Sequence, residues 1–346
     1  MKLLVTGGAG FIGSSFVRYA LRTRRDMEIV NYDLLTYAGN LRNLDEVASD
    51  PRYTFVRGDI ADQHRLEDVF AEHRFDALVN FAAETHVDRS ILDSSPFIRT
   101  NIEGTRCLLE AARRHRVPRF VQISTDEVYG SLGATGAFRE DTPLDPTSPY
   151  SASKAAADFL VLAYYRTYRV PAVITRCSNN YGPYQFPEKL IPVLITNAME
   201  DRPLPIYGDG MHVREWIFAD EHSRAVMMAL EQGTPGQIYN IGSGHEKTNL
   251  DVVREILRLM NKTESLIQFV KDRPGHDRRY AIDCSKIRRE WKWSSEIDFT
   301  SGLAATIDWY RTHQDWVREI KDASYRSYYD RMYTRREQTF AGLSGS

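Results

Sequence analysis

Short apolar runs alternate with amphipathic stretches through the first half of the chain. The apolar runs have strand length, and the stretches between them carry apolar residues at helical spacing. The pattern predicts strands over residues 2–6, 28–32, 53–57, 77–81, 119–124 and 172–176. It predicts helices between them, including 11–21, 96–115 and 150–168. Such alternation indicates an α/β fold with a doubly wound parallel sheet that helices cover on both faces.

The pattern becomes irregular after about residue 181, where prolines stand at positions 183, 187, 192, 203 and 205. Shorter strands are predicted near 215–218 and 237–241, and helices near 249–261 and 300–313. These segments predict a smaller mixed α/β lobe that binds substrate and is interleaved with the larger one. We therefore divide the chain into a domain over 1–180, which holds the catalytic residues, a lobe over 181–315 and a C-terminal tail over 316–346. The polar tail is expected to be peripheral, with residues 341–346 disordered.

Three glycines, Gly7, Gly10 and Gly13, follow the first predicted strand and open the first predicted helix. Glycines at this spacing permit a tight turn, and they let a dinucleotide's pyrophosphate approach the helix N-terminus. Asp33 ends the second strand, about 20 residues further on, where a carboxylate meets the adenosine ribose hydroxyls and repels a 2′-phosphate. The sequence thus predicts a Rossmann-type domain that binds NAD in preference to NADP.

Tyr150 and Lys154 stand four residues apart, directly after Ser148 and Pro149. A serine followed by proline is typical of a helix N-cap and first turn. Side chains at i and i+4 share a helix face, and an ammonium group beside a phenol favours the phenolate. An isolated pair of this kind is usually an ordinary surface Tyr and Lys. The glycine turn in the same chain favours a catalytic role, with Tyr150 as a base.

Polar residues follow the predicted strands at the edge of the sheet where ligands bind in this fold. Thr125, Asp126 and Glu127 follow strand 119–124, which places a hydroxyl and two carboxylates near a cofactor's reactive ring; a solvated acidic loop is the alternative. Asp59 follows strand 53–57 and is placed to meet the adenine. His86 follows strand 77–81 and is either a ligand contact or, more commonly, a structural histidine.

Composition narrows the class of protein. The net charge of −2 gives no basic field for nucleic acid. The chain has three cysteines, widely separated, which argues against disulfides and against a zinc site and fits a reducing cytoplasm. No signal peptide and no membrane-spanning run is expected. We expect a cytoplasmic protein without a metal or a membrane partner.

Three motifs together resemble the extended short-chain dehydrogenase/reductase family: GGAGFIG (7–13), STDEVYG (124–130) and SPYSASK (148–154). The acidic doublet in the second motif is similar to that of the nucleotide-sugar 4,6-dehydratases. Further matching stretches extend the similarity to about residue 313; they lie at 35–40, 82–90, 177–192, 207–216 and 272–283.

The resemblance implies a role for each catalytic candidate. Tyr150 takes the proton of the sugar 4-hydroxyl, Thr125 hydrogen-bonds that hydroxyl, and Lys154 keeps Tyr150 ionised and binds the nicotinamide ribose. Glu127 removes the C5 proton, and Asp126 protonates the departing 6-hydroxyl. Like-charge repulsion and burial can separate the pKa values of the two carboxyls, as this division requires.

The resemblance also implies the ligand contacts. Those with NAD are Gly7, Gly10, Phe11, Ile12, Gly13, Asp33, Leu34, Thr36, Asp59, Ile60, Phe81, Ala82, Ala83, Thr85, Thr100, Tyr150, Lys154 and Asn180. Those with a nucleotide-diphosphate sugar are Thr85, Thr125, Asn179, Lys189, Leu190, Pro205, Tyr207, Arg214, Asn249, Arg273 and His276. The two arginines suit a pyrophosphate because guanidinium offers forked donors, although each could instead form a surface salt bridge.

The predicted helices 96–115 and 150–168 carry apolar residues on more than one side, which calls for a second burial partner. These residues are Leu108, Leu109 and Ala112 on the first helix and Phe159, Leu160 and Leu162 on the second. The resemblance implies a homodimer in which the two helices of each subunit form a four-helix bundle.

Two other functions remain open. One is a related enzyme, either a dehydratase of a uracil nucleotide sugar such as UDP-glucose or an NAD-dependent sugar 4-epimerase. Glu127 argues against the epimerase, which needs no base at C5, but it does not identify the nucleobase. The other is a non-catalytic NAD-binding regulator, which the presence of all five catalytic candidates disfavours.

Overall fold

Seven parallel strands form the main sheet of the protein. The computed structural model describes residues 1–273, 275–321, 323–335 and 339. Within these residues the strand order is β10-β6-β5-β4-β1-β2-β3, and all neighbouring strands are parallel. The strands are β1 (Lys2–Thr6), β2 (Glu28–Asp33), β3 (Tyr53–Arg57), β4 (Ala77–Asn80), β5 (Phe120–Thr125), β6 (Ala172–Cys177) and β10 (Ile238–Ile241). The prediction of a Rossmann-type α/β fold is confirmed.

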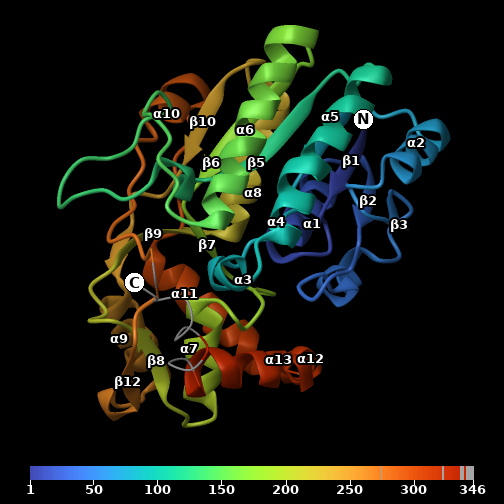
Figure 1. Ribbon diagram of the computed structural model, residues 1–346. Helices are drawn as coiled ribbons and strands as arrows, with labels where there is room; N and C mark the ends of the chain where they lie inside the picture. The colour runs from blue at the N-terminus through green and yellow to red at the C-terminus, as the bar shows by residue number, and fades with distance from the viewer. Residues whose placement is uncertain (274, 322, 336–338, 340–346) are drawn as a thin grey trace.

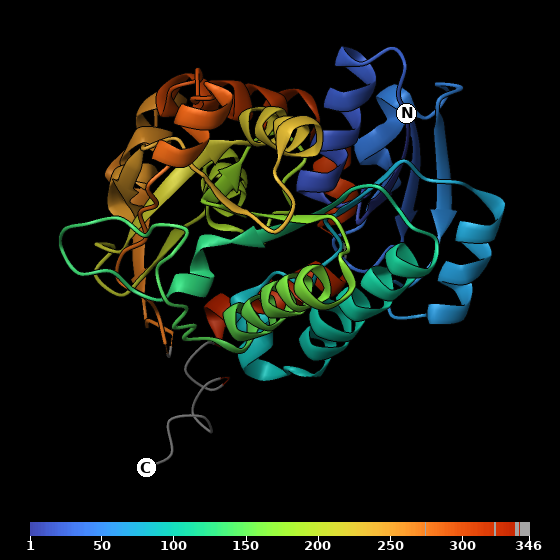
Figure 2. The same ribbon diagram turned by 90° about the horizontal axis from the view of Figure 1, so that it is seen from above.

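Helices cover both faces of this sheet (Figures 1 and 2). One face carries α2 (Gln63–Glu72), α5 (Thr105–Arg114) and α6 (Pro149–Tyr168). The other carries α1 (Phe11–Thr23), α8 (Ala219–Gln232) and α10 (Ser285–Trp291). Strands covered on both faces need apolar side chains at every position, which explains why they appear as continuous apolar runs.

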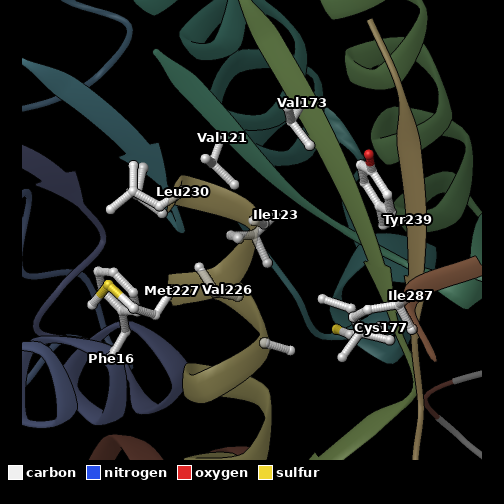
Figure 3. Close-up of a cluster of buried hydrophobic side chains, with 14 of the residues drawn as sticks. Phe16, Val121, Ile123, Val173, Cys177, Val226, Met227, Leu230, Tyr239 and Ile287 are labelled. Carbon is white, nitrogen blue, oxygen red and sulfur yellow. The ribbon is translucent and has the colours of Figure 1, made fainter. Parts of the chain in front are cut away.

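Buried hydrophobic side chains fill the space between the main sheet and helix α8 (Figure 3). The side chains in contact are Phe16 of α1, Val121 and Ile123 of β5, Val173 and Cys177 of β6, and Val226, Met227 and Leu230 of α8. All are buried. Residues from both halves of the chain therefore share one core.

The second lobe is built on two small sheets. In one, β9 (Val213–Phe218) pairs antiparallel with β11 (Glu246–Thr248) and parallel with β7 (Asn179–Tyr181). In the other, β8 (Leu204–Tyr207) pairs parallel with β12 (Ile267–Val270). Helices α7 (Leu190–Met199), α9 (Asn249–Met260) and α11 (Phe299–Thr312) pack with them in a separate hydrophobic cluster.

The chain passes between the lobes more than once. After β9 it returns to the main sheet through α8 and β10, which pairs with β6. The strand predicted near 237–241 thus lies in the main sheet, although it falls within the range 181–315 given to the smaller lobe. The division of the chain at residue 181 stays a proposal.

The helix predicted over 96–115 is divided into three parts. A short turn, α4 (Ser95–Phe97), leads into a π-helical segment, η2 (Ile98–Gly104), and then into α5. The wider turn of a π-helix shifts the side chains that follow it, and such segments are frequent at functional sites. Most of the other predicted elements agree with the structure to within about two residues, and three short 3₁₀ segments are added: η1 (Leu41–Val47), η3 (Asp126–Tyr129) and η4 (Glu264–Leu266).

The C-terminal segment is not peripheral where the structure describes it. It folds into α12 (Gln314–Ile320), α13 (Ala323–Tyr329) and the π-helical η5 (Asp330–Thr334). Trp316, Tyr325, Tyr328 and Met332 are buried. The prediction of a peripheral tail is wrong for these residues, because their aromatic side chains fill space between the lobes. The disorder expected for 341–346 lies outside the described residues.

Candidate active site

A pocket opens where the strand order reverses, between β1 and β4. Ligands bind at this point in doubly wound sheets because the loops after the two strands diverge there. Gly7 follows β1 with a positive φ of 69°, and a Cβ on Gly7 would stand 2.5 Å from the backbone nitrogen of Ala82, beyond β4. Only glycine allows the two loops to approach so closely.

The pocket begins with a turn shaped for a dinucleotide. Gly10 caps α1 with no side-chain hydrogen bond, which leaves the helix N-terminus open to an anion. A Cβ on Gly13 would collide with the carbonyl oxygen of Gly7, so helix and strand could not pack with a larger residue there. Asp33 lies beside the turn and accepts the backbone N–H groups of Ala9 (2.9 Å) and Leu35 (2.8 Å). This cradle fits NAD.

Every residue predicted to contact NAD lines this pocket, from the glycine turn to Asn180. Asp59 does so while paired with Arg99 at 2.5 Å. Thr100, on the π-helical η2, also reaches the lining. The pocket therefore unites residues that are spread over the first 180 positions, although their contact with NAD stays a prediction.

Four of the five catalytic candidates line the same pocket, namely Thr125, Glu127, Tyr150 and Lys154, whereas Asp126 is buried and is not in the lining. Tyr150 and Lys154 both line the pocket from the first two turns of α6, where Ser148 caps the helix through a capping box and Pro149 follows, as predicted. The Lys154 ammonium donates to the carbonyl of Ile123 at 2.7 Å. Thr125, at the end of β5, also lines the pocket and lies close enough to Tyr150 to lower the pKa of its hydroxyl.

The surroundings of Tyr150 oppose the ionisation that the family resemblance implies for it. Burial raises the pKa of its hydroxyl well above the usual value, and the nearby Glu127 and Cys177 raise it further. Burial in turn lowers the pKa of Lys154, which is directed at a carbonyl. Without ligands, the phenol form of Tyr150 is favoured, so Lys154 alone does not hold Tyr150 ionised.

The two neighbouring carboxyls have different surroundings. Burial raises the pKa of Asp126 well above its usual range, and the charges of Glu127 and Glu215 add to the effect. Burial also raises the pKa of Glu127, but the cations Arg273, Lys189 and Arg214 counteract it. Asp126 is thus the better candidate for a neutral acid and Glu127 for a base. Thr125 stands between them, since its hydroxyl lies 3.3 Å from Asp126 and accepts the Glu127 N–H at 3.3 Å.

The residues predicted to bind the nucleotide sugar fall into two groups. Thr85, Thr125, Asn179 and Lys189 line the pocket. The others do not appear in its lining; they are Leu190, Pro205, Tyr207, Arg214, Asn249, Arg273 and His276. Two of these are close enough to influence Glu127 by charge, namely Arg214 and Arg273. Arg273 pairs with Asp88 at 3.2 Å, so a substrate phosphate would compete with that carboxylate.

Two histidines have structural partners. His86 is buried and lies 3.0 Å from the Tyr328 hydroxyl, which favours the structural interpretation over a ligand contact. His276 and His212 both contact Asp272, and these three could in principle hold a metal ion. The rings of His212 and His276 are stacked, however, with centroids 3.7 Å apart and nearly parallel planes. Two parallel rings cannot both direct an in-plane nitrogen at one ion.

Sequence reasoning missed several residues that line the pocket, Ser124 and Glu188 among them, and it missed Asn101, which supports the lining residue Glu84. Both Ser124 and Glu188 lie within stretches that match the family, so their positions in these stretches could have identified them as pocket residues. Asn101 had no such signal. Its side-chain oxygen accepts the backbone N–H of Glu84 at 2.9 Å. Its amide nitrogen donates to the Glu84 carbonyl at 3.0 Å and to the Ser153 hydroxyl at 2.8 Å.

A doubly wound parallel sheet, a glycine cradle and a Tyr/Lys pair on one helix define an extended short-chain dehydrogenase/reductase. The family described as GDP-mannose 4,6 dehydratase matches residues 4–306. The chain belongs to this family of nucleotide-sugar 4,6-dehydratases. No helix among the described residues is long and apolar enough to cross a membrane.

Relatives refine the comparison. The dTDP-glucose 4,6-dehydratase of Neisseria meningitidis serogroup B is 51% identical and covers 94% of this chain and 97% of its own. A solved dTDP-glucose 4,6-dehydratase of Streptomyces venezuelae, with NAD and a second ligand bound, is 48% identical with a TM-score of 0.90 over 92% of this chain and 100% of its own. The UDP-glucose 4-epimerase of Thermus thermophilus, solved with NAD, is 30% identical with a TM-score of 0.84, over 90% of this chain and 100% of its own.

Proposed function

We propose that the protein converts dTDP-glucose to dTDP-4-keto-6-deoxyglucose with loss of water. The observation that carries the proposal is the assembly of Thr125, Glu127, Tyr150 and Lys154 in the pocket that holds the dinucleotide cradle, with Asp126 beside them. The relatives that are about half identical over nearly the whole chain bear that activity in their names, which supports the choice of substrate.

The first stage is removal of a proton from the sugar 4-hydroxyl. Bound NAD supplies the hydride acceptor at C4 and the hydride donor at C6, and it carries a positive charge when oxidised. Tyr150 accepts the hydroxyl proton at its phenolic oxygen, and Thr125, which lines the same pocket, holds the sugar oxygen in line. Lys154, fixed on the Ile123 carbonyl, contributes a positive charge and binds the nicotinamide ribose.

The second stage is elimination of water across C5 and C6. A ketone at C4 acidifies the hydrogen on C5. Glu127 takes that proton, and Asp126, whose pKa is raised by burial so that its acid form is favoured, protonates the departing 6-hydroxyl. A proton then returns to C5 while C6 is reduced. The net change is loss of one water without net oxidation, so the cofactor should stay bound between turnovers.

The acidic doublet separates this proposal from a 4-epimerase. Epimerisation needs oxidation and reduction at C4 but no proton transfer at C5 or C6. A buried Asp126 beside a half-buried Glu127 would serve no purpose there, and burying the Asp126 carboxyl without use would cost stability. A regulator that only binds NAD would need none of the five catalytic residues.

The direct test offers purified protein dTDP-glucose and UDP-glucose separately and follows formation of the 4-keto product. Turnover of dTDP-glucose with release of one water supports the proposal. Preferred turnover of UDP-glucose, or conversion of either sugar to its 4-epimer, would overturn it. In D2O the product should carry deuterium at C5, because the proton there comes from an exchangeable donor.

We further propose a homodimer that forms a four-helix bundle from α5 and α6. Leu108, Leu109 and Ala112, which were expected to need a partner subunit, are instead buried in the subunit's own core. The exposed apolar side chains are instead Phe159 of α6, 60% exposed, and Ile98 of η2, 54% exposed. Light scattering that gave a monomer mass at micromolar concentration would contradict this assembly. The cytoplasmic location stays a prediction.

A further inference from the structure

The C-terminal helix α13 packs behind one wall of the nucleotide-sugar pocket through two tyrosines. Tyr325 donates to the Pro187 carbonyl at 2.9 Å and contacts the ring of Phe186, and Tyr328 contacts the loop after β4. Tyr328 is 5% exposed and lies against α3 (Val87–Leu92), which follows β4. Its hydroxyl lies 3.0 Å from Nε2 of His86, and its ring lies 4.2 Å from the Arg89 guanidinium. A segment at the far end of the chain is thus packed behind a loop that lines the site.

Arg89 is enclosed by two aromatic rings. The Tyr37 ring lies 3.8 Å from the guanidinium, and Tyr328 is the second ring in contact with it. The edge of the guanidinium donates to Glu188 at 3.0 Å, where it forms an ion pair with a carboxylate whose side chain is 2% exposed. A planar cation between two rings keeps its orientation, so this stack fixes Glu188.

The two contacts of Tyr328 converge on one hydrogen bond in the pocket wall. His86 follows Thr85 in the chain, and Glu188 precedes Lys189. Both Thr85 and Lys189 line the pocket, and the Lys189 ammonium donates to the Thr85 carbonyl at 2.8 Å. The aromatic ring and hydroxyl of Tyr328 therefore hold both ends of the Thr85–Lys189 contact, each through one neighbouring residue.

We propose that Tyr328 is a positioning residue for nucleotide-sugar binding, acting through His86 and through Arg89 and Glu188 on the wall made by Thr85 and Lys189. Among the described residues that line the pocket, neither Tyr328 nor Arg89 appears, so the effect is indirect. The inference rests on the proposed function for its choice of ligand. It assigns a role in substrate affinity to a segment that has no recognisable motif.

The test compares Tyr328→Ala, Tyr328→Phe and Arg89→Lys in the full-length, NAD-loaded protein. Two quantities are measured: the Kd for dTDP, and the kcat and KM for dTDP-glucose. Tyr329→Phe is the matched control, because it removes a hydroxyl from the same helix that contacts Asn197 of α7 instead of His86.

Tyr328→Ala loses a cation–π contact and a hydrogen bond, so Kd and KM should rise about tenfold while kcat changes less than about threefold. Tyr328→Phe keeps the stack and should recover most of that loss. Arg89→Lys keeps a charge near Glu188 but loses the planar stack, and it should also raise Kd. The control should match the wild type.

Wild-type Kd in Tyr328→Ala would overturn the proposal, and if that variant does not fold, wild-type Kd in Arg89→Lys would do so. A fall in kcat at unchanged KM and Kd would also overturn it, since that is the result of general destabilisation. If the wild type binds dTDP but does not dehydrate dTDP-glucose, the proposed function fails while the Kd comparison still decides the role of Tyr328.

Discussion

Replacing Glu127 by Gln separates the first stage of the proposed reaction from the second. The amide has nearly the same shape as the carboxylate, so the pocket keeps its form, but the base for C5 is lost. General bases contribute about 10²- to 10⁴-fold to rate. At 1.36 kcal/mol for each factor of ten, the elimination barrier should rise by about 2.7–5.4 kcal/mol.

The first stage should not suffer in this variant. The charge of Glu127 is one of the causes that raise the pKa of Tyr150, after burial. Removing that charge lowers the pKa of the phenol and makes Tyr150 a more accessible base at neutral pH. The variant should therefore oxidise C4 at least as readily as the wild type and then stall, with reduced cofactor on the enzyme.

Rapid mixing with dTDP-glucose under single-turnover conditions measures both effects. Absorbance of the reduced nicotinamide should rise and persist in Glu127→Gln, while the 4-keto-6-deoxy product forms about 10²- to 10⁴-fold more slowly. Tyr150→Phe should show the opposite signature, with no reduced cofactor, because the first proton has no acceptor. Full dehydration by Glu127→Gln, or an absence of reduced cofactor in that variant, would refute the assignment.

Three further outcomes are expected. Because the pKa of Asp126 is raised, its acid form persists above the usual carboxyl range, and kcat should fall as pH rises through that raised pKa. If kcat of the Asp126→Asn variant still fell over the same pH range, Asp126 would not be the acid. Asp33→Ala should lower the dinucleotide released per chain on denaturation, since a carboxylate held by Ala9 and Leu35 is lost, and unchanged content would count against ribose binding. Asp158→Ala should leave the buried Arg176 without its 2.9 Å partner and cost about 3–5 kcal/mol in urea unfolding, whereas Asp315→Ala at an exposed pair should change little; equal effects would refute the reasoning.

Local sequence patterns were sufficient to predict the main sheet and the residues that line the cofactor side of the site. Strands buried on both faces need apolar residues at every position, and the tight turn after β1 needs glycine at Gly7 and Gly13. The start of α6 could also be predicted from the sequence, because the Ser148 side chain caps the first turn and Pro149 suits the first helical position. Such requirements act over a few residues, so the sequence displays them directly.

Other features depend on contacts between distant segments. The π-helical turn at η2 is recognised only in the structure, where Asn101 bonds the backbone of Glu84. The outward-facing residues of α5 were misjudged, because whether Leu108 or Ile98 is exposed depends on the position of α2 and α6. Periodicity counts the apolar sides of a helix but does not say which neighbour covers each side.

The sequence by itself determined the sheet, the dinucleotide turn and the choice of catalytic candidates, since each follows from short-range steric or chemical requirements. The tertiary structure alone decided the direction in which the pKa values of Tyr150, Asp126 and Glu127 shift, because burial and the charges around them come from several elements. It alone also placed Tyr328 behind the pocket wall, where residues more than 200 positions apart in the chain meet. Burial and long-range charge are properties of the packed molecule, and no segment carries them alone.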